Sequence, residues 1–170
     1  MSLFQVIAPE NFDQSPFRLI AKDWMLITAQ NGSKANAMTA SWGGMGEMWG
    51  KNVVFVVIRQ TRYTKEFVDN SLYFSLTFFD MQREGIREML TYMGSKSGRQ
   101  EDKIKKSKLT LLEDDGIPYF AEAQTAILCQ KLYAQPFDGS YFIDPELDKR
   151  WYNDTYHTLY IAEIKKILSK

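Results

Sequence analysis

The segment of residues 36–42, Asn-Ala-Met-Thr-Ala-Ser-Trp, combines an amide, two hydroxyl groups, small side chains and an aromatic ring. Thr39 and Ser41 are two positions apart, so in an extended chain their hydroxyls point to the same side. Ala37 and Ala40 are small enough to let the backbone come close to a flat ligand. Hydroxyl donors, backbone N–H groups and little steric bulk together suit a planar, anionic cofactor.

Two groups of basic and hydroxyl-bearing residues farther along the chain could hold an anion such as a phosphate. Arg59 and Arg62 follow an apolar segment, and Tyr63 and Thr64 lie at the start of an expected helix. Free N–H groups and the helix dipole attract anions at such a start. Residues 96–99, Lys-Ser-Gly-Arg, form the second group. The alternative for each of these residues taken alone is a solvated loop charge without a ligand.

Other kinds of chemistry have less support in the sequence. The single histidine, His157, and the single cysteine, Cys129, have no partner at the spacing of metal ligands. His157 is interpreted as a structural residue or as part of the rim of a site, and Cys129 as a buried, unreactive thiol. The chain contains no Gly-x-Ser-x-Gly motif, and no helical pattern follows the glycines of residues 44–50, which disfavours a Rossmann site.

Composition indicates an ordinary globular domain, and we expect one domain over residues 1–170. The chain carries 21 basic and 21 acidic residues, which argues against a non-specific nucleic-acid or membrane surface. Apolar runs fall short of the roughly 18 residues of a membrane span, and the first residues lack signal-peptide character. One cysteine excludes an internal disulfide and fits a reducing compartment, so a cytoplasmic location is expected.

Hydrophobic periodicity predicts about seven strands with two or three short helices between them. Because the strands do not alternate with long helices, a small antiparallel barrel with inserted helices is favoured over a doubly wound parallel sheet. An irregular lead-in is expected over residues 1–16, and turns at 31–32, 43–46 and 114–116. Besides the two short strands within 17–30, strands are expected at 38–42, 53–59, 73–79, 123–135 and 156–166, and a further short one at 109–112. The expected helices are 62–70, 80–93 and 100–108, with a helical turn at 145–151.

Several of these segments, in this order and at this spacing, resemble the flavin reductase-like family, and within it the flavoredoxin type. The resemblance rests on the 36–42 segment, the apolar strand that ends at Arg59, the Arg-Tyr-Thr helix start at 62–64, and the basic segment 96–103. It extends over nearly the whole chain, to the closing residues 156–163. It implies an FMN-binding split β-barrel with Greek-key-like antiparallel strands, which in this family is usually a homodimer with the flavin near the subunit interface.

The resemblance also implies which residues contact the FMN. The 36–42 segment would lie along the flavin ring and the ribityl chain, and the two basic groups would hold the ribityl phosphate. The residues implied in this way are Asn36, Ala37, Met38, Thr39, Ala40, Ser41, Trp42, Arg59, Tyr63, Thr64, Lys96, Ser97, Gly98, Arg99 and Lys103.

The sequence leaves three functions open. The first is an oxidoreductase in which NAD(P)H reduces bound FMN, which then passes electrons to a flavin, a protein or a small acceptor. The second is a flavoredoxin-type electron carrier that a partner protein reduces. The third is an aromatic-rich barrel that binds another cofactor, such as haem or a pyridoxal derivative. No catalytic acid or base stands out, because the flavin itself carries the redox chemistry.

Overall fold

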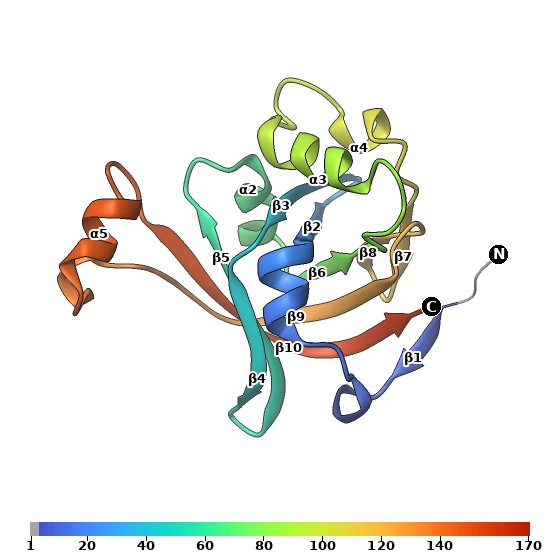
Figure 1. Ribbon diagram of the computed structural model, residues 1–170, viewed down its shortest axis with the longest axis horizontal. Helices are drawn as coiled ribbons and strands as arrows, with labels where there is room; N and C mark the ends of the chain where they lie inside the picture. Colours follow the sequence, from blue (N-terminus) through green and yellow to red (C-terminus); the bar gives the residue numbers. More distant parts are fainter. Residues whose placement is uncertain (1–3) are drawn as a thin grey trace.

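The computed structural model describes residues 4–170, and its centre is one antiparallel sheet of eight strands (Figure 1). This confirms the prediction of a mainly β, antiparallel fold, and the open sheet is consistent with a split barrel. Seven strands follow one another in the order β3 (Lys34–Ala40), β2 (Met25–Asn31), β6 (Tyr73–Phe78), β9 (Thr125–Pro136), β10 (His157–Ser169), β5 (Lys51–Arg59) and β4 (Gly43–Met48). The eighth, β1 (Gln5–Ile7), pairs with the last residues of β10.

The largest core cluster lies on one face of the sheet, because the strands present apolar side chains at alternate positions, and a second cluster lies beneath helix α3 (Ile86–Ser95). Val54, Val56 and Ile58 of β5 are buried, and Tyr160 and Ala162 lie opposite them on β10. Strand β2 is buried on both faces over its first five residues, as expected for a central strand. A separate two-stranded ribbon, β7 (Leu111–Asp114) and β8 (Ile117–Phe120), packs beside β6.

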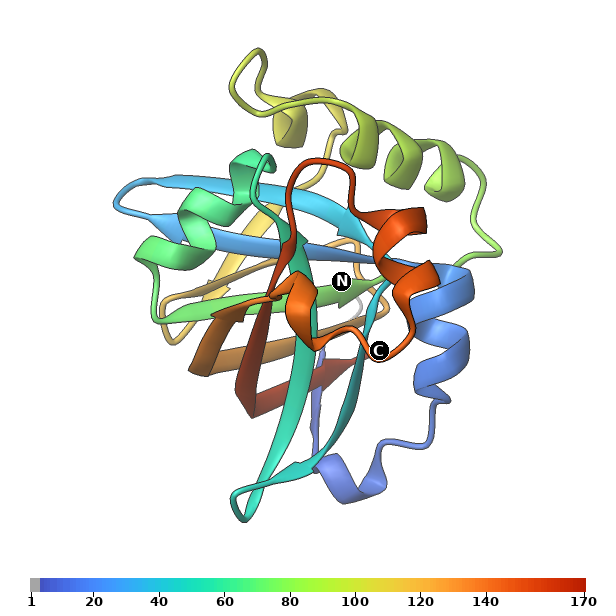
Figure 2. The same cartoon turned by 90° about the vertical axis from the view of Figure 1, so that its left-hand side faces the viewer.

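The helices are short and lie around the sheet (Figure 2). Helix α3 packs on β3 and β2, and helix α2 (Tyr63–Asn70) packs on the same two strands. Within residues 4–170, no helix has the length and apolar character needed to cross a membrane. The helical segments are α1 (Pro16–Arg18), α2 (Tyr63–Asn70), α3 (Ile86–Ser95), α4 (Lys103–Lys106) and α5 (Pro145–Trp151), with shorter or irregular turns η1 (Pro9–Asn11), η2 (Leu19–Asp23) and η3 (Gly139–Tyr141).

One part of the chain projects from the sheet. The ends of β9 and β10 continue beyond the body and carry η3 and α5 between them, as the left-hand side of Figure 1 shows. The predicted helical turn at 145–151 is therefore confirmed as α5, which begins with Pro145 at its first position and has Asp144 as its N-cap. We call residues 137–156 the projecting arm.

The first expected strand of the 17–30 segment is wrong, because residues 16–23 are helical. Pro16 occupies the first helical position, where its fixed φ and missing N–H favour a helix start. The helical turn buries Leu19 and Ile20. The lead-in is also less irregular than expected, since it contains β1.

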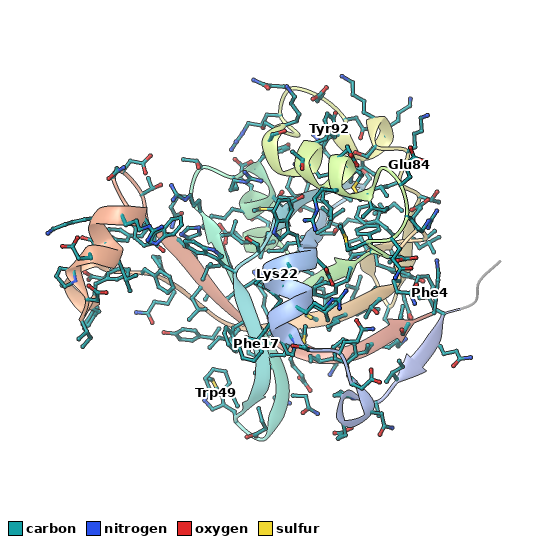
Figure 3. The ribbon with its side chains drawn as sticks, in the orientation of Figure 1. Phe4, Phe17, Lys22, Trp49, Glu84 and Tyr92 are labelled. Atoms are coloured by element: carbon teal, nitrogen blue, oxygen red, sulfur yellow. The ribbon has the colours of Figure 1, made fainter. Side chains whose placement is uncertain are left out.

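The expected glycine-rich bend at 43–46 is wrong, because these residues form β4, which pairs with β5. The glycines serve close packing instead. A Cβ on Gly43 would lie 2.3 Å from the Phe55 carbonyl oxygen, and one on Gly44 would lie 2.3 Å from the Phe55 ring. The chain turns later, at Trp49 and Gly50, and Trp49 projects into solvent there (Figure 3).

Two helix predictions need new boundaries. Asp80 does not cap a helix, because its carboxylate accepts from the N–H of Gln82 in a turn, and α3 begins six residues later, at Ile86. Gly94 does not end α3 either. It lies within the helix, where a Cβ would be 3.3 Å from Cβ of Thr39, so it lets α3 approach β3 closely. The helix expected at 100–108 is only α4, residues 103–106.

The remaining strand predictions differ mainly in length. The long strands expected at 123–135 and 156–166 correspond to β9 and β10, and that at 53–59 to β5. The turn at 31–32 is the β2–β3 hairpin, in which Gly32 has a φ of +60°. The strand expected at 109–112 is β7, shifted by two residues, and β8 was not predicted because Pro118 interrupts its pattern.

Candidate functional site

A cavity of about 300 Å³ lies where β3 ends and passes into β4, beside the end of β5 and the start of β10. We call it the strand cavity. Strand β3 supplies its apolar and hydroxyl-bearing wall, β5 and β10 supply the opposite wall, and Arg62 closes one end. The lining residues are Met38, Thr39, Ala40, Ser41, Trp42, Val57, Arg59, Arg62 and His157.

Thr39 is fixed by the helix above it. Its hydroxyl donates to the carbonyl oxygen of Leu90 in α3 at 2.5 Å, and Gly94 of the same helix leaves room for the side chain. The hydroxyl keeps lone pairs as an acceptor, but its proton is already engaged. Thr39 therefore links α3 to the cavity wall, which the alternation of Thr39 and Ser41 along the chain did not indicate.

Arg59 lies at the side of the strand cavity where the projecting arm begins. Its guanidinium donates to the Trp151 carbonyl oxygen at 2.8 Å, at the end of α5. The Trp151 ring meets Trp42 edge to face, with 4.9 Å between ring centroids. Arg59 and Trp42 thus tie the arm to the cavity.

His157 is a buried wall residue with a neutral ring. Its Nδ1 lies 3.0 Å from the hydroxyl oxygen of Tyr152, and its ring lies 5.1 Å from that of Trp42. Burial, with a smaller contribution from the charge of Arg59, lowers the pKa of His157 to about 4. The histidine is uncharged near neutral pH, which agrees with its interpretation as a structural or rim residue.

A second cavity, of about 230 Å³, lies between the start of α2 and the end of α3. We call it the cation cavity, because three basic side chains line it and, in the described part of the chain, no acidic side chain does. Four of its other residues carry aliphatic hydroxyls. The lining residues are Thr61, Arg62, Tyr63, Thr64, Ser95, Lys96, Ser97, Gly98 and Lys103.

Arg62 borders both cavities and so connects them. It is the N-cap residue of α2, and its side chain, which has only donors, accepts no hydrogen bond from the first N–H groups of the helix. Among residues 4–170, neither the Arg62 guanidinium nor the Lys96 ammonium forms a hydrogen bond or an ion pair within the chain. Burial lowers the pKa of Arg62, which nevertheless remains charged at neutral pH. Two cations without acceptors, Arg62 at the start of α2 and Lys96 at the end of α3, can hold an anion between them.

A close contact between β3 and the basic segment shapes the cation cavity. Nδ2 of Asn36 donates to the buried Thr64 hydroxyl at 2.8 Å. Gly98 packs against the same asparagine, so closely that a Cβ there would lie 2.1 Å from Oδ1 of Asn36. The absence of a side chain at position 98 therefore lets the segment that carries Lys96 and Ser97 lie against β3 and α2.

The structure separates the residues that the sequence assigned to one site. Met38 to Trp42 and Arg59 line the strand cavity, whereas Tyr63, Thr64, Lys96, Ser97, Gly98 and Lys103 line the cation cavity. Thr39, Arg59 and Lys96 hence do not surround a single cavity, but two cavities that Arg62 joins. Arg59 belongs to the strand cavity and not to the cation-rich one.

Three predicted residues line neither cavity. Ala37 is fully buried beneath α3 with Leu26 and Leu90. Asn36 borders a third cavity on the far side of Gly98. Arg99 pairs with Glu66 and lies over the Tyr63 ring, 4.7 Å from its centroid, so its charge is already neutralised.

Sequence reasoning missed several lining residues. Arg62 was noted as a basic residue at a helix start but was left out of the predicted site, and Thr61 and Ser95 had no signal apart from their hydroxyls. Val57 looked like one more residue of an apolar strand. In the sequence, the position of Arg62 between a strand end and a helix start was the available indication of its role.

The chain matches the model of the flavin reductase like domain over residues 17–169 and belongs to this family. Solved structures with the same fold include an FMN-binding domain of a flavin reductases-like enzyme from Shewanella baltica OS155, which is 18% identical. The TM-score is 0.69, and the alignment covers 98% of this chain and 76% of that one.

Two further structures are similar to the same degree. Flavoredoxin from Methanosarcina acetivorans is 19% identical, with a TM-score of 0.68 and coverage of 87% of this chain and 68% of that one. An FMN-binding protein from Thermus thermophilus, with bound 1-cyclohex-2-enone, is 19% identical, with a TM-score of 0.67 and coverage of 97% and 77%. No curated protein matches the chain. At these identities the structures establish a shared fold.

Proposed function

We propose that this protein binds FMN across the two cavities, with the flavin ring in the strand cavity and the phosphate in the cation cavity. The observation that carries the proposal is the composition of the cation cavity: three cations, several hydroxyls, a helix start and no acid among the described lining residues. A phosphate dianion is the common ligand that needs such a set of donors. Family membership supports a flavin as the rest of the ligand.

The residues present fit each part of FMN. Arg62 and Lys96 have donors to spare for phosphate oxygens, and the first N–H groups of α2 face the same cavity. On the ring side, the backbone of 38–42 can approach a flat ligand because Ala40 and Ser41 are small. Arg62 lies between the two cavities, where the ribityl chain would connect ring and phosphate.

A bound flavin would supply hydride and electron transfer, and the protein's own residues would position it. Trp42 and the edge of Trp151 would limit access to the ring from the arm side. Neutral His157 would leave the ring surroundings without an added charge, while Arg59 would supply one positive charge at the wall. No proton transfer by a side chain is needed for hydride transfer to a flavin.

For the reaction, we propose electron transfer from NAD(P)H through bound FMN to a flavin, a protein or a small acceptor. The alternative is an electron carrier that a partner protein reduces. To decide, the protein is loaded with FMN without oxygen and mixed with NADH or with NADPH, and the flavin's visible absorbance is followed. Bleaching by either nucleotide supports the oxidoreductase. No bleaching by either, with full bleaching by dithionite, favours the carrier, and failure to retain flavin after soaking rejects both.

We further propose a homodimer that uses the outer face of β9, β10 and β5. Residues paired across these strands lie on the same face, and three of them, Phe55, Ile161 and Tyr133, form one apolar row. Phe55 and Tyr133, which lie on either side of Ile161, are 38% and 42% exposed, so both ends of the row are open to solvent. A formal net charge of zero removes a general repulsion between copies.

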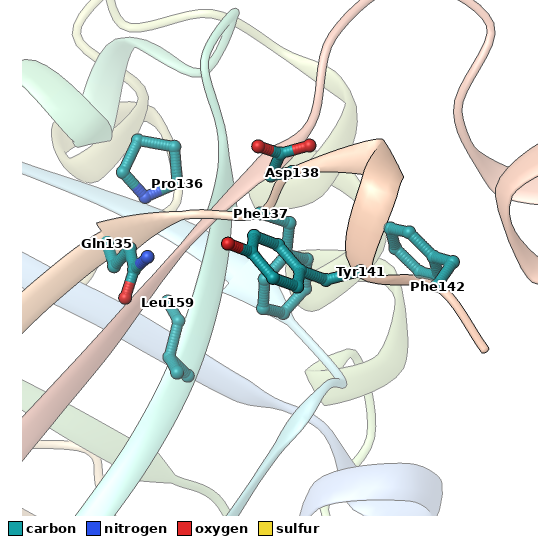
Figure 4. Close-up of a pocket in the computed structure, with 7 residues that line it drawn as sticks. All are labelled: Gln135, Pro136, Phe137, Asp138, Tyr141, Phe142 and Leu159. Atoms are coloured by element: carbon teal, nitrogen blue, oxygen red, sulfur yellow. The ribbon is translucent and has the colours of Figure 1, made fainter.

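The projecting arm extends this apolar surface. Between the arm and the sheet lies a cavity of about 360 Å³ whose walls include Phe137, Tyr141, Phe142 and Leu159 (Figure 4). Nearby, Ile143 is 99% exposed. Because Val57, Arg59 and His157 of the strand cavity lie on the same sheet face, a second copy seated there would also cover the ring end of the flavin site.

We also propose a cytoplasmic location, since the one cysteine is a fully buried free thiol that suits reducing surroundings.

A further inference from the structure

Lys103 is the most deeply buried charged side chain near the cation cavity. The residue is 3% exposed and begins the short helix α4. Its ammonium donates to the carbonyl oxygen of Met93 at 2.8 Å and to that of Lys96 at 3.1 Å. No ion pair with an acid is formed by this ammonium within residues 4–170. A buried cation without a counter-ion destabilises the fold, so its presence here points to a function that outweighs this cost.

The two carbonyl groups that Lys103 binds lie at the end of α3, on either side of Gly94 and Ser95. Helix ends leave carbonyl groups without partners, and a cation there is favourable. The contact fixes the course of residues 93–96 as they leave the helix. The next residues, Ser97 and Gly98, then reach the contact with Asn36. Lys103 thus joins the end of α3 to the residues that carry Lys96 and Ser97 at the cavity.

We propose that Lys103 is a positioning residue for the flavin phosphate, whose buried ammonium holds residues 93–98 in place and supplies a charge that the phosphate neutralises. This inference rests on the proposed function. It differs from a direct phosphate contact, because the donors of Lys103 are directed at backbone carbonyls. Its effect on FMN would pass through Lys96, Ser97 and the local electric field.

The neighbouring charges make the ammonium responsive to an anion. Burial, and then the charge of Arg62, lower the pKa of Lys103 to about 8, while Glu101 acts in the opposite direction. Titratable or charged residues line both cavities that Lys103 borders. In the cation cavity these are Arg62, Tyr63 and Lys96, and in the cavity beyond Gly98 they are Lys34, Glu101, Asp102 and Lys105.

A phosphate placed in the cation cavity would favour the protonated form of Lys103. Above pH 8 the free protein would have lost this proton and would have to regain it on binding FMN. The affinity for FMN is therefore expected to fall as pH rises, by up to about tenfold for each pH unit above the pKa of Lys103. Riboflavin, which lacks the phosphate, should bind equally well over the same range.

The test measures dissociation constants of FMN and riboflavin between pH 7 and 9.5 by quenching of flavin fluorescence, for the wild type, Lys103→Met and Lys103→Arg. Lys103→Met should weaken FMN at pH 7 by about tenfold or more and leave riboflavin unchanged. Lys103→Arg, whose charge does not titrate, should remove most of the pH dependence. Lys105→Met is the matched control, because it removes an exposed lysine from the same helix.

Each outcome decides the proposal. FMN affinity of Lys103→Met equal to that of Lys105→Met would overturn it, as would a slope in Lys103→Arg as steep as in the wild type. If Lys103→Met does not fold, as judged by circular dichroism, the wild-type and Lys103→Arg profiles decide alone. Loss of flavin binding by the wild type at every pH would instead refute the proposed function.

Discussion

At the scale of single residues, Arg62 decides how the site is organised. It borders both cavities, its side chain has no partner in the described chain, and it lies at the start of α2. The family resemblance implied a phosphate contact for Arg59, three residues earlier, and left Arg62 out of the predicted site. The structure gives Arg59 another partner, the Trp151 carbonyl oxygen, and a place in the strand cavity.

Replacing Arg62 with alanine should therefore weaken FMN binding by about 10–100-fold through loss of a charge-assisted contact to the phosphate. Riboflavin affinity should fall much less, because riboflavin has no phosphate to lose that contact. Arg59→Ala is the comparison, and it should affect both ligands alike because Arg59 lies on the ring side. Calorimetric titration of both variants with both ligands measures this. An equal loss of FMN and riboflavin affinity in Arg62→Ala would place the phosphate elsewhere.

At the scale of elements, α2 is held at its far end so that its start can face the cation cavity. The ammonium of Lys131 on β9 donates to the carbonyl oxygens of Val68 and Asp69 at the end of the helix. The Asp69 carboxylate in turn accepts from the hydroxyl of buried Tyr160 at 2.5 Å and from Lys65 at 2.7 Å. Burial raises the pKa of Tyr160, and the hydrogen bond to Asp69 adds to this effect.

Lys131→Met should lower the free energy of unfolding by about 1 kcal/mol, since it removes a cation from the carbonyl end of α2. Urea denaturation followed by circular dichroism gives the value. Lys105→Met again serves as the control, because it removes an exposed charge elsewhere. If both variants lose the same stability, Lys131 does not anchor the helix. FMN affinity of the folded variant should stay close to that of the wild type.

At the scale of the whole molecule, the apolar outer face of β9, β10 and β5 and the projecting arm lie next to the open side of the strand cavity. Their position beside the site is the reason to connect dimer formation with flavin binding. Leu72, directly before β6, is an exposed apolar residue outside this surface, and a single residue of this kind needs no partner.

Tyr133→Glu should convert the proposed dimer to monomers, because it would place a charge at the β9 end of the apolar row. Sedimentation equilibrium measures the mass of the wild type and the variant. Leu72→Glu is the matched control, with an exposed apolar side chain on another surface, and it should leave the mass unchanged. A wild type that sediments as a monomer at all accessible concentrations would refute the proposed interface.

The sequence alone determined the class of fold and the segments from which the site is built. Alternating apolar residues define β5, β6, β9 and β10 locally, and the hydroxyl-rich 36–42 segment and the 96–99 segment are recognisable from composition. Predictions failed where the residue pattern favours one local structure and the packing of the folded chain imposes another. The first part of the 17–30 segment reads as a strand and folds as a helix, and the glycines at 43–46 read as a bend and pair as β4 to accommodate Phe55.

Only the tertiary structure decided how the site residues are divided between two cavities, and which charges remain available. Arg99 meets Glu66, Arg59 meets Trp151, and Lys103 is buried against two carbonyl groups, whereas Arg62 and Lys96 stay without partners in the described chain. These contacts join segments that lie far apart in the sequence. A side chain's availability depends on what packs against it, and the local sequence pattern carries no information on that.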